Sequence, residues 1–204
     1  MDKLMGGRNW RWQGRQAFGI ITVLIFGCGI LFGVLACHIL DTDRLRPLTE
    51  YYAAYFQSTL PQSSAVAIYR SIIQTNLLDL LKLIFFGLCL IGAPFILILL
   101  FTKGFAIGFV AAVLLLNTGL KGAAAVLCGV VLPKLIYIPL ILSAGAFFLQ
   151  CSWELLSRQM SAYWLQFIVR CLLLALGLIA AGCLEGFLLQ NVFGEFLGSI
   201  FSAG

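Results

Sequence analysis

Long runs of apolar residues without a charged side chain constrain this sequence more than any other feature. Residues 17–40 contain no Asp, Glu, Lys or Arg, and the same holds for residues 83–101. About 20 apolar residues in a helix are enough to cross the hydrocarbon core of a bilayer. Over the 204 residues, 62% are hydrophobic and 10% are charged, whereas a soluble domain has roughly 25% charged residues. The sequence therefore predicts an integral membrane protein.

The apolar windows predict an all-α, polytopic protein with one membrane domain over residues 1–204 and five transmembrane helices packed as a bundle. The expected segments are a basic N-terminus at 1–16, helices at 17–40, 81–101, 104–118, 122–150 and 164–193, and a loop at 41–79. The third helix is about 22 Å long at 1.5 Å per residue, which is short of the roughly 30 Å core. A re-entrant hairpin over 104–132, turning at Asn117–Gly122, is therefore an alternative that places the C-terminus on the other side of the membrane.

The charges of the N-terminal segment predict its orientation. This segment has four basic residues, Lys3, Arg8, Arg11 and Arg15, and one acidic residue, Asp2. Positively charged flanks remain cytoplasmic, so we expect a multi-pass cell-membrane protein with a cytoplasmic N-terminus and the lipid bilayer as its surroundings. The net charge of +5 does not point to nucleic acid as a partner, because no long basic run or basic helix face occurs.

The loop at 41–79 is expected outside the cytoplasm, and its apolar residues recur at three- and four-residue steps, which predicts two amphipathic helices. The candidate partner-docking residues are Leu45, Leu48, Tyr52, Tyr55, Phe56, Ile68 and Ile72. Two compatible interpretations stand: the helices lie in the membrane interface with their aromatic rings at headgroup depth, or they form a docking surface for a partner. The loop is too small to fold alone as a catalytic domain.

Five charged residues are candidates for positions inside the membrane: Lys103, Lys121, Lys134, Arg170 and Glu185. Lys103, Lys121 and Arg170 lie near predicted helix ends, where long side chains reach the interface. Glu185 lies within its predicted helix and must be neutral, paired or facing a polar crevice. Lys134 is its expected partner, because antiparallel helices can bring the two residues level. Such a pair is either structural or part of a transport site, and a transporter usually has more such groups and repeated broken helices.

No catalytic, cofactor-binding or metal-binding residues are predicted. The seven cysteines form no CxxC pair, and the single histidine, His38, has no second ligand nearby. No Ser–His or Asp–Asp pair suited to an intramembrane protease is apparent. We therefore expect a protein that is not an enzyme.

The small-residue motif GxxxG occurs four times, at Gly29–Gly33, Gly104–Gly108, Gly182–Gly186 and Gly194–Gly198. The motif allows helix backbones to approach closely. It predicts close packing of helices and leaves self-association open.

Four stretches carry a resemblance to a known family: "NLLDLLKLIFFGLCLIGAPFILILLFTKGFAIGF", the Gly/Ala-rich "GLKGAAAVLCGVV", "LPKLIYIPLILSAGAFFLQ" and "AGCLEGFLLQ". Together with the basic N-terminus and the loop, they resemble the stage II sporulation protein M family. The candidate structural and interaction residues are Lys103, Gly104, Phe105, Gly108, Pro133, Lys134, Pro139 and Glu185. Many broader members of the family have His after the LP and an acid before the second Pro. Lys134 and Ile138 stand there instead, which favours the sporulation branch.

The resemblance implies a non-enzymatic scaffold of sporulation. It would anchor two peptidoglycan-degrading proteins of the engulfment complex in the septal membrane of the mother cell while that membrane surrounds the forespore. Pro133 and Pro139 are expected to kink the fourth helix and to shape a groove for a partner's transmembrane anchor. The alternative function is a small transporter or permease-like subunit that uses Glu185 and Lys134.

Overall fold

The computed structural model describes residues 2–40, 47, 65–89, 91–126, 131–156 and 164–189. All regular elements in these residues are helical: α1 (Asp2–Ile39), α4 (Ala65–Leu88), α5 (Gly92–Val126), α6 (Leu132–Lys134), α7 (Tyr137–Leu156) and α8 (Trp164–Phe187). Five windows within them are long and apolar enough to cross a membrane: Gln16–Ile39, Val66–Leu88, Gly92–Leu116, Tyr137–Leu155 and Phe167–Phe187. The predicted fold class is confirmed.

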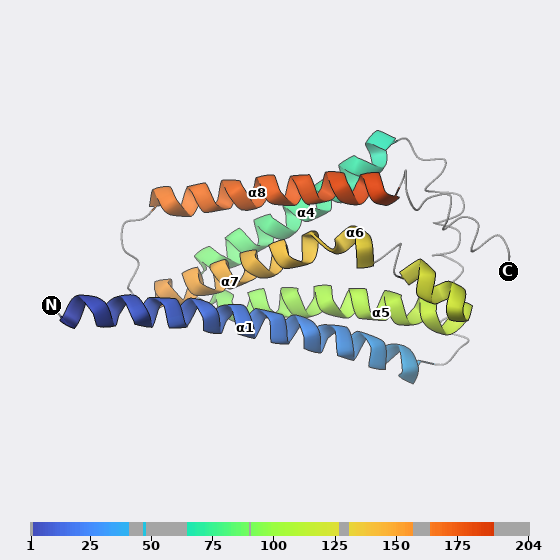
Figure 1. Ribbon diagram of the computed structural model, residues 1–204, viewed down its shortest axis with the longest axis horizontal. Helices are drawn as coiled ribbons and strands as arrows, with labels where there is room; N and C mark the ends of the chain where they lie inside the picture. The colour runs from blue at the N-terminus through green and yellow to red at the C-terminus, as the bar shows by residue number, and fades with distance from the viewer. Residues whose placement is uncertain are drawn as a thin grey trace.

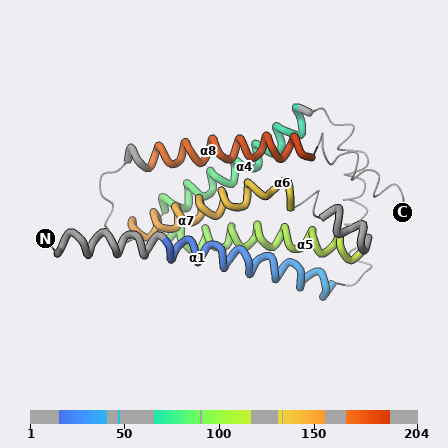
Figure 2. The backbone as a smooth tube through the Cα atoms, in the orientation of Figure 1, coloured from blue at the N-terminus to red at the C-terminus, as the bar shows by residue number. Residues whose placement is uncertain are grey.

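The five long helices lie side by side and alternate in direction along the chain (Figure 1). Helix α1 therefore starts at one end of the bundle and α8 finishes at the other. We call one end of the bundle the α6 end: α1 finishes there, α4 starts there and α6 lies there. The α4–α5 turn lies at the opposite end. The backbone trace shows the same arrangement (Figure 2).

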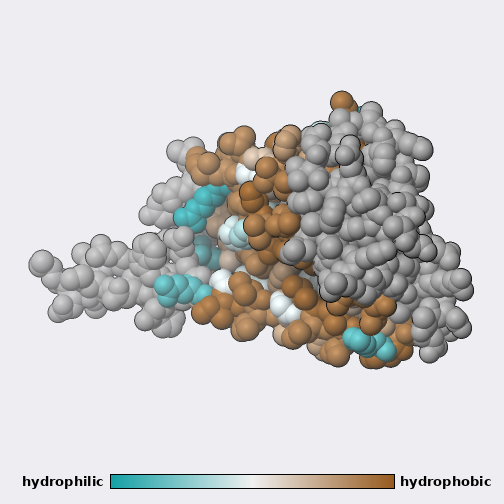
Figure 3. Space-filling view, turned by 45° about the vertical axis from the view of Figure 1, so that its right-hand side comes forward, coloured by the Kyte–Doolittle hydropathy of each residue, from teal (hydrophilic) through white to brown (hydrophobic). Residues whose placement is uncertain are grey.

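Apolar side chains cover both the interior and much of the surface of the bundle. The space-filling view shows a broad apolar band, with hydrophilic side chains mainly toward its ends (Figure 3). Large hydrophobic residues such as Leu31, Phe85 and Leu172 are more than half exposed. Such a surface is stable in lipid, where exposed apolar side chains need no further burial.

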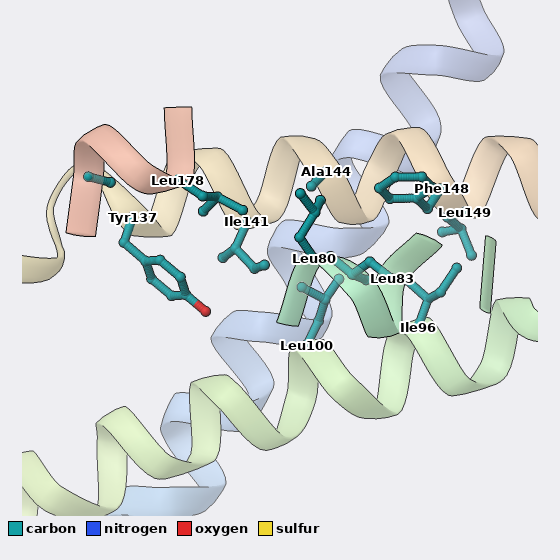
Figure 4. Close-up of a cluster of buried hydrophobic side chains, with 11 residues drawn as sticks. Leu80, Leu83, Ile96, Leu100, Tyr137, Ile141, Ala144, Phe148, Leu149 and Leu178 are labelled. Carbon is teal, nitrogen blue, oxygen red and sulfur yellow. The ribbon is translucent and has the colours of Figure 1, made fainter. Parts of the chain in front are cut away.

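The helices pack in two pairs with α7 between them. Helix α1 lies along α5, α4 lies against α8, and α7 contacts all four. The main core contains Leu83, Ile96, Leu100, Ile141 and Phe148, each at 0% exposure. The close-up shows side chains from α4, α5 and α7 meeting there (Figure 4).

The second and third spans lie elsewhere than predicted. The helix expected at 81–101 is two helices, because α4 ends at Leu88 and α5 starts at Gly92. Pro94 in the first turn of α5 has no N–H for a preceding carbonyl and cannot continue α4. A Cβ on Gly92 would collide with the carbonyl of Phe86, so the tight turn requires glycine there.

The turn between α4 and α5 is fixed by hydrogen bonds. The backbone N–H of Gly92 donates to the Cys89 carbonyl at 3.1 Å. The Ser152 hydroxyl of α7 donates to the same carbonyl, also at 3.1 Å. The Cys89 carbonyl, just past the end of α4, thus accepts one hydrogen bond from the turn and one from the neighbouring helix.

The helix expected at 104–118 is the second part of α5, and Asn117–Gly122 is helical instead of a turn. The prediction of a short third helix, or of a re-entrant hairpin over 104–132, was wrong because the helix already begins at Gly92. The helix expected at 122–150 is also divided: α5 ends at Val126, and α7 begins at Tyr137. Helix α8 ends at Phe187, six residues before the predicted end at 193.

The predicted loop at 41–79 extends too far. Residues 65–79 belong to α4, so Ile68 and Ile72 lie in the second span instead of a docking loop. Ile68 is buried, and Ile72 lies beside Gly182 of α8. The other predicted docking residues, Leu45, Leu48, Tyr52, Tyr55 and Phe56, lie outside the described residues.

Candidate functional site: an intramembrane polar network

An ion pair lies near the middle of two membrane-spanning helices. The Lys103 Nζ of α5 is 2.6 Å from the Asp79 Oδ2 of α4, and the Asp79 side chain is 1% exposed. Asp79 is close to the centre of span Val66–Leu88, and Lys103 is close to the centre of span Gly92–Leu116. A lone charge at such depth costs several kcal/mol, and the ion pair reduces that cost because each residue neutralises the charge of the other.

Tyr137 joins a third helix to this pair. Its hydroxyl donates a hydrogen bond to Asp79 Oδ2 at 2.9 Å. Tyr137 is the first residue of α7, and its side chain is buried. The carboxylate of Asp79 therefore accepts from α5 and α7 through the same oxygen.

A second ion pair lies at the α6 end. The Lys134 Nζ is 2.8 Å from the Glu185 Oε1, with the Lys134 side chain 32% exposed and that of Glu185 6% exposed. The Lys134 ammonium also lies 5.3 Å from the centroid of the Tyr137 ring, within the range of a cation–π contact. The predicted pairing of Lys134 with Glu185 is confirmed.

These contacts form one connected chain, which we call the polar network: Glu185, Lys134, Tyr137, Asp79 and Lys103. They come from α8, α6, α7, α4 and α5 in that order. Because each member lies on a different element, the network ties together most of the bundle.

The depths of the charged residues are the reverse of those predicted. Lys103 was expected at a helix end and lies near mid-span, whereas Glu185 was expected within its helix and lies two residues from the end of α8. The misplaced boundary at 101–104 accounts for the error at Lys103. Arg170 does lie on the exposed surface, with its guanidinium 5.2 Å from the Phe147 ring centroid. The side chain of Lys121 is outside the described residues.

Asp79 and Tyr137 are the members of the network that the sequence analysis missed. Asp79 was placed at the end of the predicted loop, so its depth went unrecognised. The spacing of Asp79 from Asn76 offered a signal, since both polar side chains fall on one helix face three residues apart. Asn76 is buried too, and its amide donates to the Leu178 carbonyl at 3.4 Å.

Two carboxylate oxygens of the network have no hydrogen-bond donor among the described groups. They are Asp79 Oδ1 and Glu185 Oε2, and both are buried. Lys82 Nζ lies 3.8 Å from Asp79 Oδ1, which is beyond hydrogen-bond distance.

The residues of the KGFxIGF motif in α5 contact two different helices. Lys103 contacts Asp79 of α4, while Gly104 and Gly108 lie against the backbone of α1. In return, Gly29 and Gly33 of α1 lie against the backbone of α5. The carbonyl oxygens that a Cβ at these four glycines would strike belong to Phe26, Ile30, Phe101 and Phe105. Two GxxxG motifs therefore pack against each other, and the Phe105 ring stacks on Phe109 with centroids 5.9 Å apart.

The third GxxxG motif packs α8 against α4. A Cβ on Gly182 would lie 3.1 Å from the Asn76 amide nitrogen, and one on Gly186 would lie 2.5 Å from the Tyr69 ring. The fourth motif, Gly194–Gly198, is outside the described residues. The predicted close packing is confirmed for the three described motifs.

The helix is broken between the two prolines of LPKLIYIP. Residues 132–134 form α6, Leu135–Ile136 is a turn, and α7 starts at Tyr137. Pro139 lies in the first turn of α7, where a missing N–H is tolerated. In a continuous helix the Pro139 ring would clash with the Leu135 carbonyl four residues earlier. The expected kink is therefore a break, and it places Lys134 and Tyr137 on either side of the turn.

Within the part of the chain that the structure describes, no three His, Cys, Asp or Glu side chains gather where they could hold a metal ion. The described cysteines are free thiols. The polar network thus consists of carboxylates, ammonium groups, one phenol and their mutual contacts.

Comparison with known proteins gives one finding. The family model described as "Stage II sporulation protein M" matches residues 22–188. No curated protein and no solved structure gives a match. The matched range includes all five spans except the start of α1 and every residue of the polar network. Members of this family are sporulation-related membrane proteins, and the chain belongs to the stage II sporulation protein M family.

Proposed function

We propose that this protein is a non-enzymatic membrane scaffold that anchors two peptidoglycan-degrading proteins at the septal membrane during engulfment of the forespore. The observation that carries the proposal is the family match over residues 22–188. That match covers every residue of the polar network, so we place the proposed role in the membrane bundle. The proposed location is the mother-cell membrane, with the N-terminus in the cytoplasm.

The internal use of charge supports a scaffold. Lys103 and Lys134 are each paired with a carboxylate inside the same chain. Such pairs hold helices in one arrangement, which suits a protein whose task is to present a fixed surface. A transporter that uses Glu185 and Lys134 would instead need the pair to open during each cycle.

The scaffold role is tested by deletion and complementation in the source organism. Cells are imaged with a membrane dye during sporulation while a fluorescently tagged septal hydrolase is followed. We expect a flat or bulging septum without the protein, and a hydrolase that does not collect there. Completed engulfment with the hydrolase in place would contradict the scaffold role.

Two complementing variants separate the scaffold from the transporter. Glu185→Gln removes the negative charge but keeps the shape of the side chain and an oxygen that can accept from Lys134. Because the Lys134 side chain is 32% exposed, a scaffold that still folds should still support engulfment. Polar substitutions of Tyr52 and Tyr55, which lie in the predicted loop, should impair hydrolase recruitment if that loop docks the partners. The opposite pattern, with loss only in Glu185→Gln and solute uptake by the wild-type protein in liposomes, would favour the transporter.

A further inference from the structure

Helix α4 differs from its neighbours in the side chains that it exposes. The exposed residues within 20–35 of α1 and within 172–187 of α8 are all Leu, Ile, Val, Phe, Ala or Cys. On α4, exposed polar residues recur at spacings of three, four and seven, which place them on one side of the helix. We call them the polar stripe: Ser71, Gln74, Thr75 and Lys82. The stripe lies within span Val66–Leu88, at a depth where polar side chains seldom face lipid.

Gln74 is the member of the stripe that most needs a partner. It lies three residues (77 minus 74) from the centre of the span at Leu77, which is about 4.5 Å along the helix axis. Its side chain is too short to reach a membrane interface roughly 15 Å away. The Thr75 hydroxyl donates to the Ser71 carbonyl of its own helix, but the Gln74 amide makes no hydrogen bond in the described part of the chain. An amide left unbonded in hydrocarbon is costly.

Lys82 adds a positive charge to the stripe. Its side chain is 57% exposed, and its Nζ is 3.8 Å from Asp79 Oδ1. The Asp79 carboxylate already pairs with Lys103 at 2.6 Å. Two ammonium groups therefore share one carboxylate, which leaves one positive charge in excess at the surface of the bundle. An acidic side chain on an adjacent helix would neutralise that charge, as intramembrane charges generally do in pairs.

The charge of the stripe also decides which kind of partner fits it. In a symmetric dimer the same patch of both copies meets, so Lys82 of one copy would lie opposite Lys82 of the other. Asp79 is the single acidic residue of α4, and it is buried and paired. Helix α4 thus has no exposed carboxylate to offer a second copy.

We propose that the polar stripe binds a transmembrane helix of a different protein. That helix carries an acidic side chain level with Lys82 and a hydrogen-bonding side chain level with Gln74. Polar side chains of this kind hold helices together in lipid, where no hydrophobic driving force exists. The inference rests on the stripe alone and is independent of the scaffold role.

Synthetic transmembrane helices test the proposal with the full-length protein in vesicles of phosphatidylcholine, a lipid without net charge. The probes share a Leu/Ala host sequence. One probe is unmodified, one has Gln near its centre, and one has Glu six residues from an end, which matches the distance of Lys82 from the end of α4 (88 minus 82). Energy transfer between a donor on the protein and an acceptor on the probe measures binding. We expect the Glu and Gln probes to bind about five to thirty times more tightly than the host probe.

Two variants assign each preference to one residue. Lys82→Met should abolish the advantage of the Glu probe and leave that of the Gln probe, whereas Gln74→Leu should do the reverse. Binding that each variant retains shows that it is folded. Arg170→Met is the matched control, because Arg170 is also an exposed cation in a span but lies on α8, and it should change neither preference.

Three outcomes would overturn the proposal. The unmodified protein could bind all probes equally. The Glu advantage could survive Lys82→Met, or be lost equally in Arg170→Met. Energy transfer between copies of the protein that Gln74→Leu abolishes would assign the stripe to a second copy instead.

Discussion

Asp79 is the residue on which the buried polar contacts converge. Its carboxylate is held by Lys103 of α5 and by Tyr137 of α7, and almost none of it is exposed. The free energy of such a site is asymmetric. Losing one partner leaves an uncompensated charge in the membrane, whereas replacing both with apolar groups removes the charge and its cost together.

Lys103→Met should therefore destabilise the protein by about 3–5 kcal/mol, the range for breaking one partner of a buried pair. The double variant Asp79→Leu with Lys103→Met should recover much of that loss. Thermal unfolding of the purified protein in detergent measures both. Lys82→Met is the control, because Lys82 is 57% exposed and 3.8 Å from Asp79, and it should change the Tm little. A Lys82 variant as unstable as the Lys103 variant would contradict the assignment.

Tyr137→Phe should cost about 1.5–3 kcal/mol, which is typical of a hydrogen bond to a charged group. The ring remains in place under Lys134, so the loss isolates the hydroxyl. The measurement is again thermal unfolding, repeated in a background that carries Asp79→Leu and Lys103→Met. The effect should shrink in that background, because the acceptor is gone. Equal losses in both backgrounds would mean that Tyr137 stabilises the bundle in another way.

At the scale of single residues, the sequence allowed one of the two ion pairs of the polar network to be predicted. Lys134 and Glu185 were recognisable as charges within apolar windows. Opposite charges on antiparallel helices can pair with each other, which led to the correct prediction. Asp79 and Lys103 were hidden because "LKLIFFGLCLIGAPFILILLF" is apolar enough to be one helix. Only the position of the break decides whether the flanking charges lie at helix ends or at mid-span.

Among the helices, α1 and α5 have the closest contact between backbones. Gly29 and Gly33 meet Gly104 and Gly108 so tightly that a Cβ at any of them would strike a carbonyl oxygen of the neighbouring helix. Close approach of this kind lets van der Waals contacts and Cα–H···O contacts hold helices together where no hydrophobic driving force exists.

Gly29→Leu should separate α1 from α5 and cost about 1–3 kcal/mol or more, as overpacking does. Gly27→Leu is a matched control two residues away in the same helix, where a Cβ meets nothing within 4 Å. A pair of cysteines introduced across the α1–α5 contact should form a disulfide in the control and less of it in Gly29→Leu. Equal yields in the two variants would rule out the close contact.

The boundaries of the elements were only partly predictable. The sequence signal for the α4–α5 turn is Gly92 with Pro94, and it was outweighed by the length of the apolar run. The signal at Asn117–Gly122 was misleading, since these residues continue α5 as a helix past the span Gly92–Leu116. A glycine inside a helix costs only about 1 kcal/mol relative to alanine and does not end the helix by itself. By contrast, the prolines of LPKLIYIP predicted an interruption correctly. A missing N–H removes a helix hydrogen bond in any surroundings.

For the molecule as a whole, five alternating spans place the start of α1 and the end of α8 at opposite ends of the bundle. A reporter inserted within 157–163 should therefore lie on the same side of the membrane as the N-terminus. A reporter fused after residue 189 should lie on the opposite side. Paired reporters, one active only in the cytoplasm and one only outside it, measure this. Both sites on one side would mean that α8, the helix between them, does not cross.

The pairing of Asp79 with Lys103 also bears on how the chain enters the membrane during synthesis. A charge at the centre of a helix raises the cost of translocon insertion by about 2.5–3.5 kcal/mol, and Asp79 leaves the ribosome 24 residues before Lys103 (103 minus 79). Because few residues separate Leu88 from Gly92, we expect α4 and α5 to enter the membrane together as a hairpin in which Lys103 neutralises Asp79. A nascent chain truncated after Leu88 should integrate less completely than one truncated after Leu116. The ion pair thus predicts that the unit of insertion is the pair of helices α4 and α5.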